Sequence, residues 1–242
     1  MAIALDNSGQ GSSAAQAAGV AFTFSYTVNS NVNGILILAI QTGDNAGSNH
    51  QQPSAVSYNG SAMTFISGAS QAVGANQCAT SMWYLLAPST GSNTVSITVP
   101  STGSGSGASR IIAYPASYTG AKQTGQPDSS STNSAGSGTS FTSTTTTVAD
   151  NCWTLALFFS NQAASPTAGT GTTLRQSSNT IGSGTMYGDS NAVVHPAGSN
   201  SMSANGNSGL WTGAIISIAP APASLPLLPV NINQSVKRSN YF

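Results

Sequence analysis

The chain has 242 residues, a formal net charge of zero and only 4% charged side chains, against about 25% in ordinary globular proteins. So little charge gives no long-range attraction for a polyanion, and this argues against nucleic acid and acidic membranes as partners. The hydrophobic fraction of 39% is too high for a disordered chain, and it falls in short blocks between Ser, Thr, Gly and Asn, which predicts strands joined by polar turns.

The acidic residues support an all-β prediction. The chain has no glutamate, and its acids are Asp6, Asp44, Asp128, Asp150 and Asp189. The charged pairs that favour helices are therefore missing throughout the sequence.

The first residues do not resemble a secretion signal. Met1 to Leu5 lack a basic start and give way to Asp6 before an apolar stretch can form. The longest apolar run, Ile35 to Ile40, is far shorter than the roughly 20 residues that cross a bilayer. We therefore expect synthesis in the cytoplasm without a signal peptide, and a location in a virion or another extracellular assembly.

The first half of the chain contains two kinds of predicted strand. Residues Ala21–Val28 and Thr94–Val99 alternate apolar and polar side chains, which predicts strands with one buried face. Residues Gly34–Ile40 and Ser81–Ala87 are continuously apolar, which is typical of strands covered on both faces. A further strand, Arg110–Tyr114, closes this half.

A hairpin is predicted where Asn59-Gly60 separates Val56–Tyr58 from Ala62–Ile66. An Asn-Gly pair between two apolar runs is the strongest short-range signal for a two-residue hairpin turn, because both residues must take positive φ.

The second half repeats this plan in shortened form, and this is the most informative pattern in the sequence. Residues Thr27–Val32 and the apolar run that follows align without gaps on Thr147–Cys152 and the run to Phe159. At a smaller shared offset, two more pairs of segments align: Ser81–Trp83 with Thr185–Tyr187, and Ile111–Ala113 with Ile215–Ser217. Chance alignment of two β-rich halves of biased composition is the alternative.

These patterns predict an antiparallel β-sandwich of jelly-roll type over residues 1–220, because duplication of a Greek key produces that topology. Its halves are expected at about 20–116 and 140–220, joined by a Ser-, Gly- and Thr-rich link at 117–139. A single sandwich is preferred to two stacked domains.

The proline pattern after residue 220 predicts an extended arm over residues 221–242, because prolines remove backbone donors and fix the chain in an extended form. Within the arm, the candidate partner-binding residues are its apolar, basic and aromatic side chains. These are Leu225, Leu227, Leu228, Val230, Lys237, Arg238, Tyr241 and Phe242.

The two cysteines and three tryptophans have structural interpretations. Cys78 and Cys152 are too few for a disulfide-rich scaffold and form no C-x-x-C metal pair, so we expect two small buried residues, with a single bridge as the alternative. Trp83, Trp153 and Trp211 lie in apolar strands, which favours core packing over stacking on sugar rings.

No catalytic, cofactor or metal site is predicted. Scattered aspartates are unpromising as a glycosidase pair, and no G-x-S-x-G elbow accompanies either His50 or His195. Asp44-Asn45 and Asp189–Asn191 are better explained as side-chain-capped turns than as calcium loops. The glycines from Gly103 to Gly107 have no lysine or helix after them, so they do not predict a phosphate loop.

Several segments together carry a resemblance to a known group of proteins. They are Val56–Thr64, Met82–Gly91, Thr94–Val99, Ala113-Tyr114, Tyr118–Gly120, the Thr-rich run Thr142–Val148 and the final strand Leu210–Ile218. This pattern, covering most of residues 20–220, resembles Ser/Thr/Gly-rich β-sandwich proteins found in phages and as modules of bacterial extracellular proteins. The resemblance implies a jelly-roll fold without known catalysis, and it assigns no functional residues.

These observations lead us to expect a non-enzymatic structural protein of a virus particle, such as a capsid decoration protein or a tail or fibre component. Its partners would be copies of itself or another coat protein, contacted through sandwich faces and the arm. The alternative is a carbohydrate-binding or adhesion module that binds glycans through exposed aromatic side chains.

Overall fold

The computed structural model describes residues 1–17, 19–43, 52–66, 71–73, 78–99, 109–180 and 182–223. These residues form antiparallel strands and no helix, which confirms the predicted all-β sandwich class. No helix in the described part is therefore long and apolar enough to cross a membrane. The jelly-roll topology stays a prediction.

The N-terminal half of the chain contributes one large and one small sheet. The strands of the large sheet are β1 (Ala4–Ser8), β2 (Gly11–Gln16), β4 (Ile35–Gly43), β7 (Thr64–Phe65), β8 (Gln71–Val73), β9 (Cys78–Leu86) and β11 (Ser109–Thr119). They follow the order β1-β11-β4-β9-β7, with β2 also on β11 and β8 on β9. The small sheet contains β3 (Ala21–Val28), β5 (Ala55–Tyr58), β6 (Ser61–Ala62) and β10 (Gly91–Thr98), in the order β3-β10-β5-β6.

The C-terminal half repeats this division. Its large sheet contains β12 (Ser129–Ala135), β14 (Trp153–Ser160), β16 (Thr173–Ser178), β17 (Gly184–Asp189) and β19 (Trp211–Ile218). Its small sheet contains β13 (Ser140–Thr146), β15 (Thr167–Ala168) and β18 (Ser199–Asn205). The orders are β12-β19-β14-β17-β16 and β13-β18-β15, so each strand of the C-terminal half has a counterpart at the same place in the N-terminal half.

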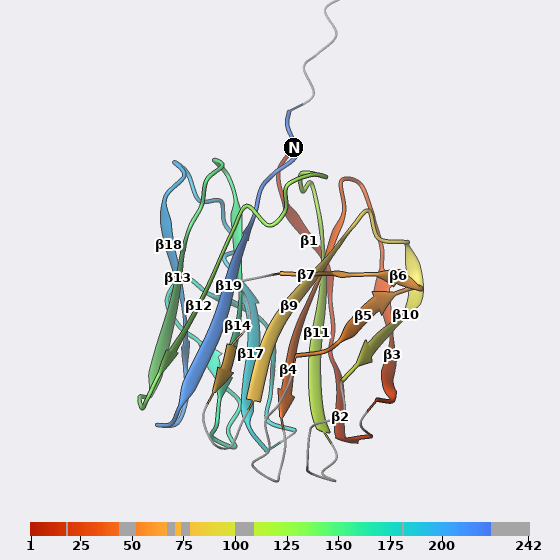
Figure 1. Cartoon of the computed structure of the whole chain (residues 1–242). Helices are drawn as coiled ribbons and strands as arrows, with labels where there is room; N and C mark the ends of the chain where they lie inside the picture. The colour runs from red at the N-terminus through yellow and green to blue at the C-terminus, as the bar shows by residue number, and fades with distance from the viewer. Residues whose placement is uncertain are drawn as a thin grey trace, which may run out of the picture.

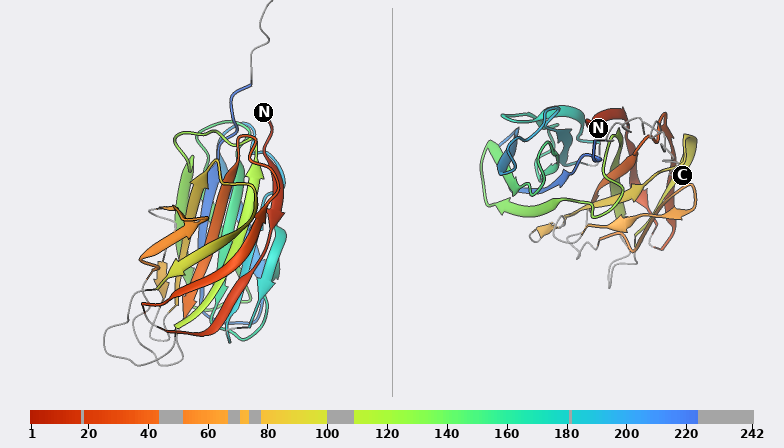
Figure 2. Two further views of the ribbon diagram at one scale, coloured as in Figure 1. Left: turned by 90° about the vertical axis from the view of Figure 1, so that its right-hand side faces the viewer. Right: turned by 90° about the horizontal axis from the view of Figure 1, so that it is seen from above.

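The two halves lie side by side as two sandwiches joined through their large sheets (Figures 1 and 2). One buried cluster contains side chains of both large sheets, including Ile37 and Tyr114 from one half and Leu157 and Ile216 from the other. Separate clusters fill the space between the large and small sheet of each half. The preferred single sandwich is therefore wrong, because each half closes a core of its own and the halves share a third.

The position of strand β4 between two cores explains why its sequence is continuously apolar. Ile35, Ile37 and Ala39 face the core shared by the halves, whereas Leu36 and Leu38 face the core of the N-terminal sandwich. Side chains of a strand alternate between faces, so a strand in the second layer of a four-layer stack needs apolar residues at every position.

The repeat holds at the level of strands but not at the predicted register. Asn33 and Asn151 both have positive φ two residues before β4 and β14, so the structure pairs Asn151 with Asn33 and not with Asn31. Met82 faces the shared core and Met186 the C-terminal core, which also displaces the predicted match of Ser81–Trp83 with Thr185–Tyr187. The aligned strands carry apolar side chains on both faces. The alignment therefore had no apolar–polar alternation with which to fix the register.

The predicted link at 117–139 is also partly wrong. Strand β11 continues to Thr119, and β12 pairs along its whole length with β19. Strands β1 and β2, which the sequence did not predict, take the corresponding place beside β11. Their Ser- and Asn-rich sequences carry no apolar alternation, so only pairing with an already buried neighbour makes them strands.

Other local predictions are confirmed. Asn59 and Gly60 have φ values of 48° and 77°, as a hairpin turn between β5 and β6 requires. Trp83, Trp153 and Trp211 are buried, so none forms an exposed platform. Cys152 is a free, buried cysteine, which removes the alternative of a disulfide bridge to it.

Candidate functional site

The aspartates of the described residues are used to hold loops together. Asp6 accepts hydrogen bonds from the Asn29 amide at 2.9 Å and the Ser117 hydroxyl at 2.7 Å. Asp128 accepts the amides of Val148 and Ala149 at 2.7 and 3.1 Å. Both carboxylates therefore serve as hydrogen-bond acceptors that connect loops of the sandwich. Asp44 lies outside the described residues.

Asp189 forms a buried polar contact between the halves. Its carboxylate is fully buried and forms a two-pronged ion pair with Arg175, at 2.7 Å to Nε and 2.8 Å to a terminal guanidinium nitrogen. The Tyr118 hydroxyl, from the other half, donates to the same carboxylate at 2.9 Å. Burying an unpaired carboxylate would cost several kcal/mol of stability, and this bidentate pair compensates that cost.

Two tyrosines complete this network. The hydroxyl groups of Tyr118 and Tyr187 lie 3.1 Å apart inside the shared core. Burial raises the pKa of both phenols well above the ordinary value, and the negative charge of Asp189 raises both further. Both therefore stay protonated at neutral pH, and the cluster is enclosed, so it joins the sandwiches and offers no access to a substrate.

The histidine that the structure describes, His195, lies beside Asp150 and not beside Ser190. His195 is 60% exposed in its side chain, and its Nδ1 lies 3.7 Å from Asp150, whose other oxygen accepts the Ala197 amide. Ser190 donates to the Ala192 carbonyl at 2.7 Å and is not directed at a histidine. The neighbourhood of Asp189, Ser190 and His195 in sequence therefore does not become a triad. His50 lies outside the described residues.

The turn at Asp189–Asn191 is capped by its own side chain, as expected. The Asn191 amide donates to Asp189 at 3.0 Å, and the Asn191 side chain accepts from Arg175. In the described part of the chain no three His, Cys, Asp or Glu side chains gather as metal ligands would. Asp44-Asn45 and Gly103–Gly107 lie outside that part.

The predicted arm falls almost wholly outside the described residues, which end at Ala223. This applies to all of its candidate partner-binding residues, Leu225, Leu227, Leu228, Val230, Lys237, Arg238, Tyr241 and Phe242. The structure does define the place where the arm begins. Ala221 donates its amide to Gly120 and accepts from the Met1 amino group at 2.8 Å, so the first residue and the arm leave the same end of the molecule (Figure 1).

Apolar side chains are exposed around this place, which we call the arm end. Met1, Val32, Val148 and Val193 are between 49% and 76% exposed. Backbone hydrogen bonds connect this region to the start of the arm at Ala221. The Gly120 amide donates to the Val32 carbonyl, for example, and the Ala221 amide donates to the Gly120 carbonyl. A groove of about 520 Å³ lies here, lined by Met1, Lys122, Asn151, Val193 and Ala219–Ala223 among others.

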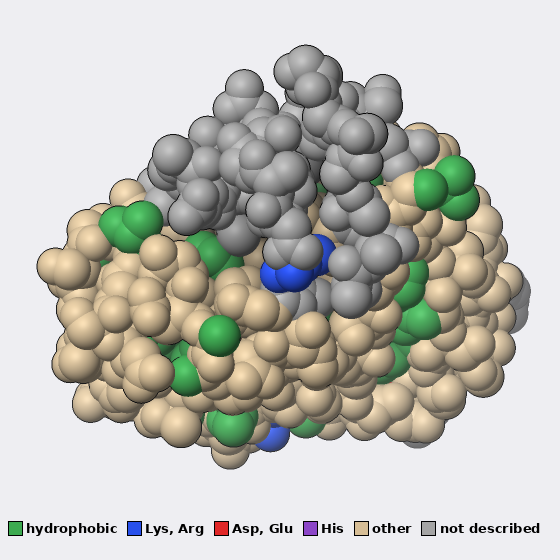
Figure 3. Space-filling model, turned by 90° about the horizontal axis from the view of Figure 1, so that it is seen from below, with side chains coloured by type: hydrophobic (Ala, Val, Ile, Leu, Met, Phe, Trp, Pro, Cys, Tyr) green, Lys and Arg blue, Asp and Glu red, His purple; other side chains and the backbone are tan. Residues whose placement is uncertain are grey.

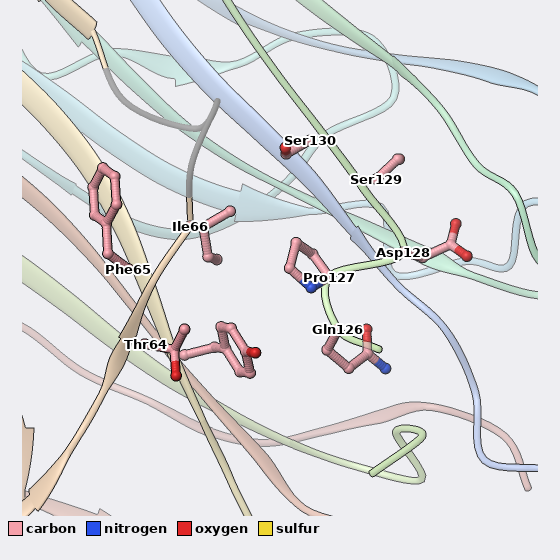
Figure 4. A pocket seen from close by; sticks show the side chains of 9 residues that line it. Thr64, Phe65, Ile66, Gln126, Pro127, Asp128, Ser129 and Ser130 are labelled. Carbon is pink, nitrogen blue, oxygen red and sulfur yellow. The ribbon is translucent and has the colours of Figure 1, made fainter. Parts of the chain in front are cut away.

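A second hollow, which we call the furrow, runs between the edges of the two large sheets. It measures about 450 Å³, with Thr64–Ile66 and Tyr84 from the N-terminal half and Gln126–Ser130 from the C-terminal half. Figure 4 shows Ile66 directed toward Pro127, the Phe65 ring directed away from both, and the carboxyl group of Asp128 directed away from the hollow. Phe65 is 37% exposed and rests edge-on against Trp83, with ring centroids 5.0 Å apart.

Sequence reasoning found neither surface. The arm end combines four loops and both ends of the described chain, and the furrow combines β7 with a segment that the sequence suggested was a link. The cis Gln126-Pro127 peptide bond and the single exposed Phe65 carry no signal that separates them from ordinary turns and strands.

Comparison with protein-family models and with curated proteins finds no match to this chain.

Proposed function

We propose that the protein is a non-enzymatic building block of a virus particle, such as a capsid decoration protein or a tail or fibre component. The observation that carries this proposal is the arm end. Exposed apolar side chains, a groove and the start of the proline-rich arm gather at one end of the double sandwich. Apolar groups gathered in one place are typical of contacts with another protein.

The remaining surface supports the same proposal. Most outward side chains of β13 and β18 face one another as hydroxyl pairs, for example Thr144 and Ser201, whose oxygens lie 2.7 Å apart. Figure 3 shows the end opposite the N-terminus, where uncharged polar and backbone atoms dominate the part that is coloured by type and no acidic side chain is visible. Such surfaces add no charge repulsion when many copies stand close together.

Removal of the arm tests the proposal. The chain should be cut after Ala223, because Ala219 and Ala221 form backbone hydrogen bonds with Lys122 and Gly120 that belong to the sandwich. We expect the shortened protein to keep the melting temperature of the full chain and to lose assembly, measured by sedimentation and electron microscopy of both. Normal assembly of the shortened protein would contradict the proposal.

A carbohydrate-binding or adhesion module is the second candidate, and the exposed ring of Phe65 favours it. This ring rests edge-on against Trp83, and an exposed aromatic face is the type of surface on which a sugar ring stacks. A glycan array on the purified protein distinguishes the candidates. Glycan binding that disappears on Phe65→Ser, with assembly unaffected, would support this second candidate over the first.

A further inference from the structure

We propose that the arm end is a contact between two copies of this chain, in which each copy presents the same face to the other about a two-fold axis. This inference rests on the proposed function and names the partner of the surface that carries it. It follows from where the exposed apolar side chains lie, from the two charges beside them and from the place where the described chain ends.

The arm end holds most of the exposed apolar side chains. Four of the seven large apolar side chains that the described residues expose lie there, namely Met1, Val32, Val148 and Val193. Their loops come from both halves of the molecule, and Ala219–Ala223 add further apolar atoms to the wall of the groove. Apolar groups gathered in this way release water on contact with another protein, which favours association.

One basic and one acidic side chain lie in the same groove. Lys122 and Asp150 are both exposed, and both line it. In the part of the chain that the structure describes, Lys122 has no ion-pair partner, and Asp150 lies 3.7 Å from Nδ1 of His195. A carboxylate accepts up to about four hydrogen bonds, so Asp150 has room for a second cation. Both charges are therefore available to a partner.

A surface that carries both signs of charge fits a copy of itself. When two identical faces meet about a two-fold axis, residue i of one copy contacts residue j of the other, and j contacts i. Lys122 of each copy then faces Asp150 of the other, while the apolar side chains pack together. A partner with charges of one sign would repel either Lys122 or Asp150. A second copy is therefore the occupant that suits this surface.

The place where the described chain ends agrees with such a pair. Ala223 lines the groove, and residues 224–242 follow it. Residues 221–223 lead away from both sandwiches (Figure 1). In a pair joined at the arm end, each arm starts inside the contact and continues along the other copy, so the arms add contact without a larger folded interface.

Exchange of the two charges tests the contact. The full chain should sediment as a dimer, because a two-fold contact closes after two copies. We expect Lys122→Asp and Asp150→Lys each to weaken dimerisation about tenfold at low ionic strength, because like charges then meet twice in every pair. An equimolar mixture of the two variants should dimerise like the parent, because opposite charges meet again in the mixed pair. The double variant should do the same.

The proposal is overturned if neither single change weakens dimerisation, or if neither the mixture nor the double variant restores it. Asp150→Lys also removes the acceptor of the Ala197 amide, which lies 2.6 Å from the carboxylate. The melting temperature of each variant is therefore measured beside its dimerisation, and Lys122→Asp changes an exposed side chain that the fold does not use.

Photocrosslinking of the full chain gives a second measurement, which needs no change of charge. Val193 is replaced by p-benzoylphenylalanine, and isotopically heavy and light chains are mixed before illumination. We expect crosslinked peptides that join position 193 of one chain to residues 1–2 or 219–230 of the other. Crosslinks only within single chains, crosslinks between chains at another surface, or none at all would overturn the proposal.

Two matched valines test the apolar part of the contact. Val193 is 49% exposed at the arm end, and Val20 is 54% exposed at the opposite end of β3, about 26 Å away along an eight-residue strand. We expect Val193→Ser to weaken dimerisation severalfold and Val20→Ser to leave it unchanged, measured by analytical ultracentrifugation. Equal weakening by both substitutions would count against the arm end.

The two proposals fail in different ways. If charge exchange and position 193 both fail to report the arm end, this contact is wrong, and loss of assembly on removal of the arm still supports the proposed function. If charge exchange restores pairing but the chain cut after Ala223 assembles like the full chain, the proposed function fails and the contact between copies stands.

Discussion

The edge strands of the two large sheets occupy equivalent places, but the side chains at these places are charged in one half and uncharged in the other. Thr64 of β7 pairs with Tyr84 of β9, and Thr173 of β16 pairs with Asp189 of β17. Two residues further along the chain from Thr64 and Thr173, Ile66 is buried and apolar, whereas Arg175 binds Asp189. One half therefore places an ion pair where the other places an isoleucine and a half-buried tyrosine.

The difference shows which part of each half is closed. On the C-terminal side the guanidinium of Arg175 covers the carboxylate, and the Tyr118 hydroxyl reaches it from the other half. On the N-terminal side Tyr84 remains half-buried in the wall of the furrow. The repeated fold places equivalent residues at both positions. In the C-terminal half they form a buried contact that connects the two halves, and in the N-terminal half they line an accessible surface.

The largest effect should follow loss of the buried charge pair. We expect Asp189→Asn to lower the free energy of unfolding by about 3 kcal/mol or more, because it leaves Arg175 only 15% exposed and without its carboxylate. Urea denaturation of the variant and the parent measures the difference. Tyr84→Phe, at the equivalent position, should change stability by about 0.5 kcal/mol or less.

A double substitution sharpens this prediction. Arg175→Leu combined with Asp189→Leu removes both charges together, so it should cost clearly less than Asp189→Asn alone. A double variant that is less stable than the single one would show that the attraction between Arg175 and Asp189 exceeds the free-energy cost of burying their charges.

The second effect concerns high pH and the core shared by the halves. The raised pKa values of Tyr118 and Tyr187 mean that the unfolded state loses these protons first, near pH 10. Stability should therefore be complete below about pH 10 and should fall as the pH rises further, at up to about 1.4 kcal/mol per pH unit for each buried tyrosine.

Tyr187→Phe checks this dependence. The variant should lose less stability than the parent between pH 10 and pH 11.5, as followed by denaturation at a series of pH values. An unchanged slope would mean that these phenols ionise in the folded protein as they do in water.

The smallest effect concerns the turns before β4 and β14. A Cβ atom added to Gly34 would lie 2.8 Å from the backbone of Asn31, whereas the equivalent position holds Cys152. We expect Gly34→Cys to cost about 1–3 kcal/mol through backbone strain. Cys152→Ala should cost about 1 kcal/mol or less, and thermal denaturation of both variants tests the asymmetry between the turns.

The thiol of Cys152 gives a control for that comparison. Burial raises its pKa to about 12, with the nearby charge of Asp128 adding to the effect. Cys152 should therefore react with alkylating reagents only when the C-terminal half opens. Rapid labelling at position 152 in the Gly34→Cys variant would show that strain in one half spreads to the other.

The sequence by itself determined the strand class, the hairpin at Asn59-Gly60, the burial of the tryptophans and the absence of a recognisable catalytic motif. Each of these depends on side-chain alternation or on local turn geometry, which a few neighbouring residues define. It also indicated that the halves share a plan, because equivalent strands need apolar residues at equivalent places.

Only the tertiary structure decided how the halves meet and what lies between them. Strands β1, β2 and β12 form because a buried neighbour offers them hydrogen-bonding partners, which their own polar sequences do not reveal. The pairing of Asp189 with Tyr118 and the furrow beside Phe65 join residues far apart in the chain. Periodicity reports which face of a strand is apolar but not which sheet will cover it, so these contacts have no signal in the sequence alone.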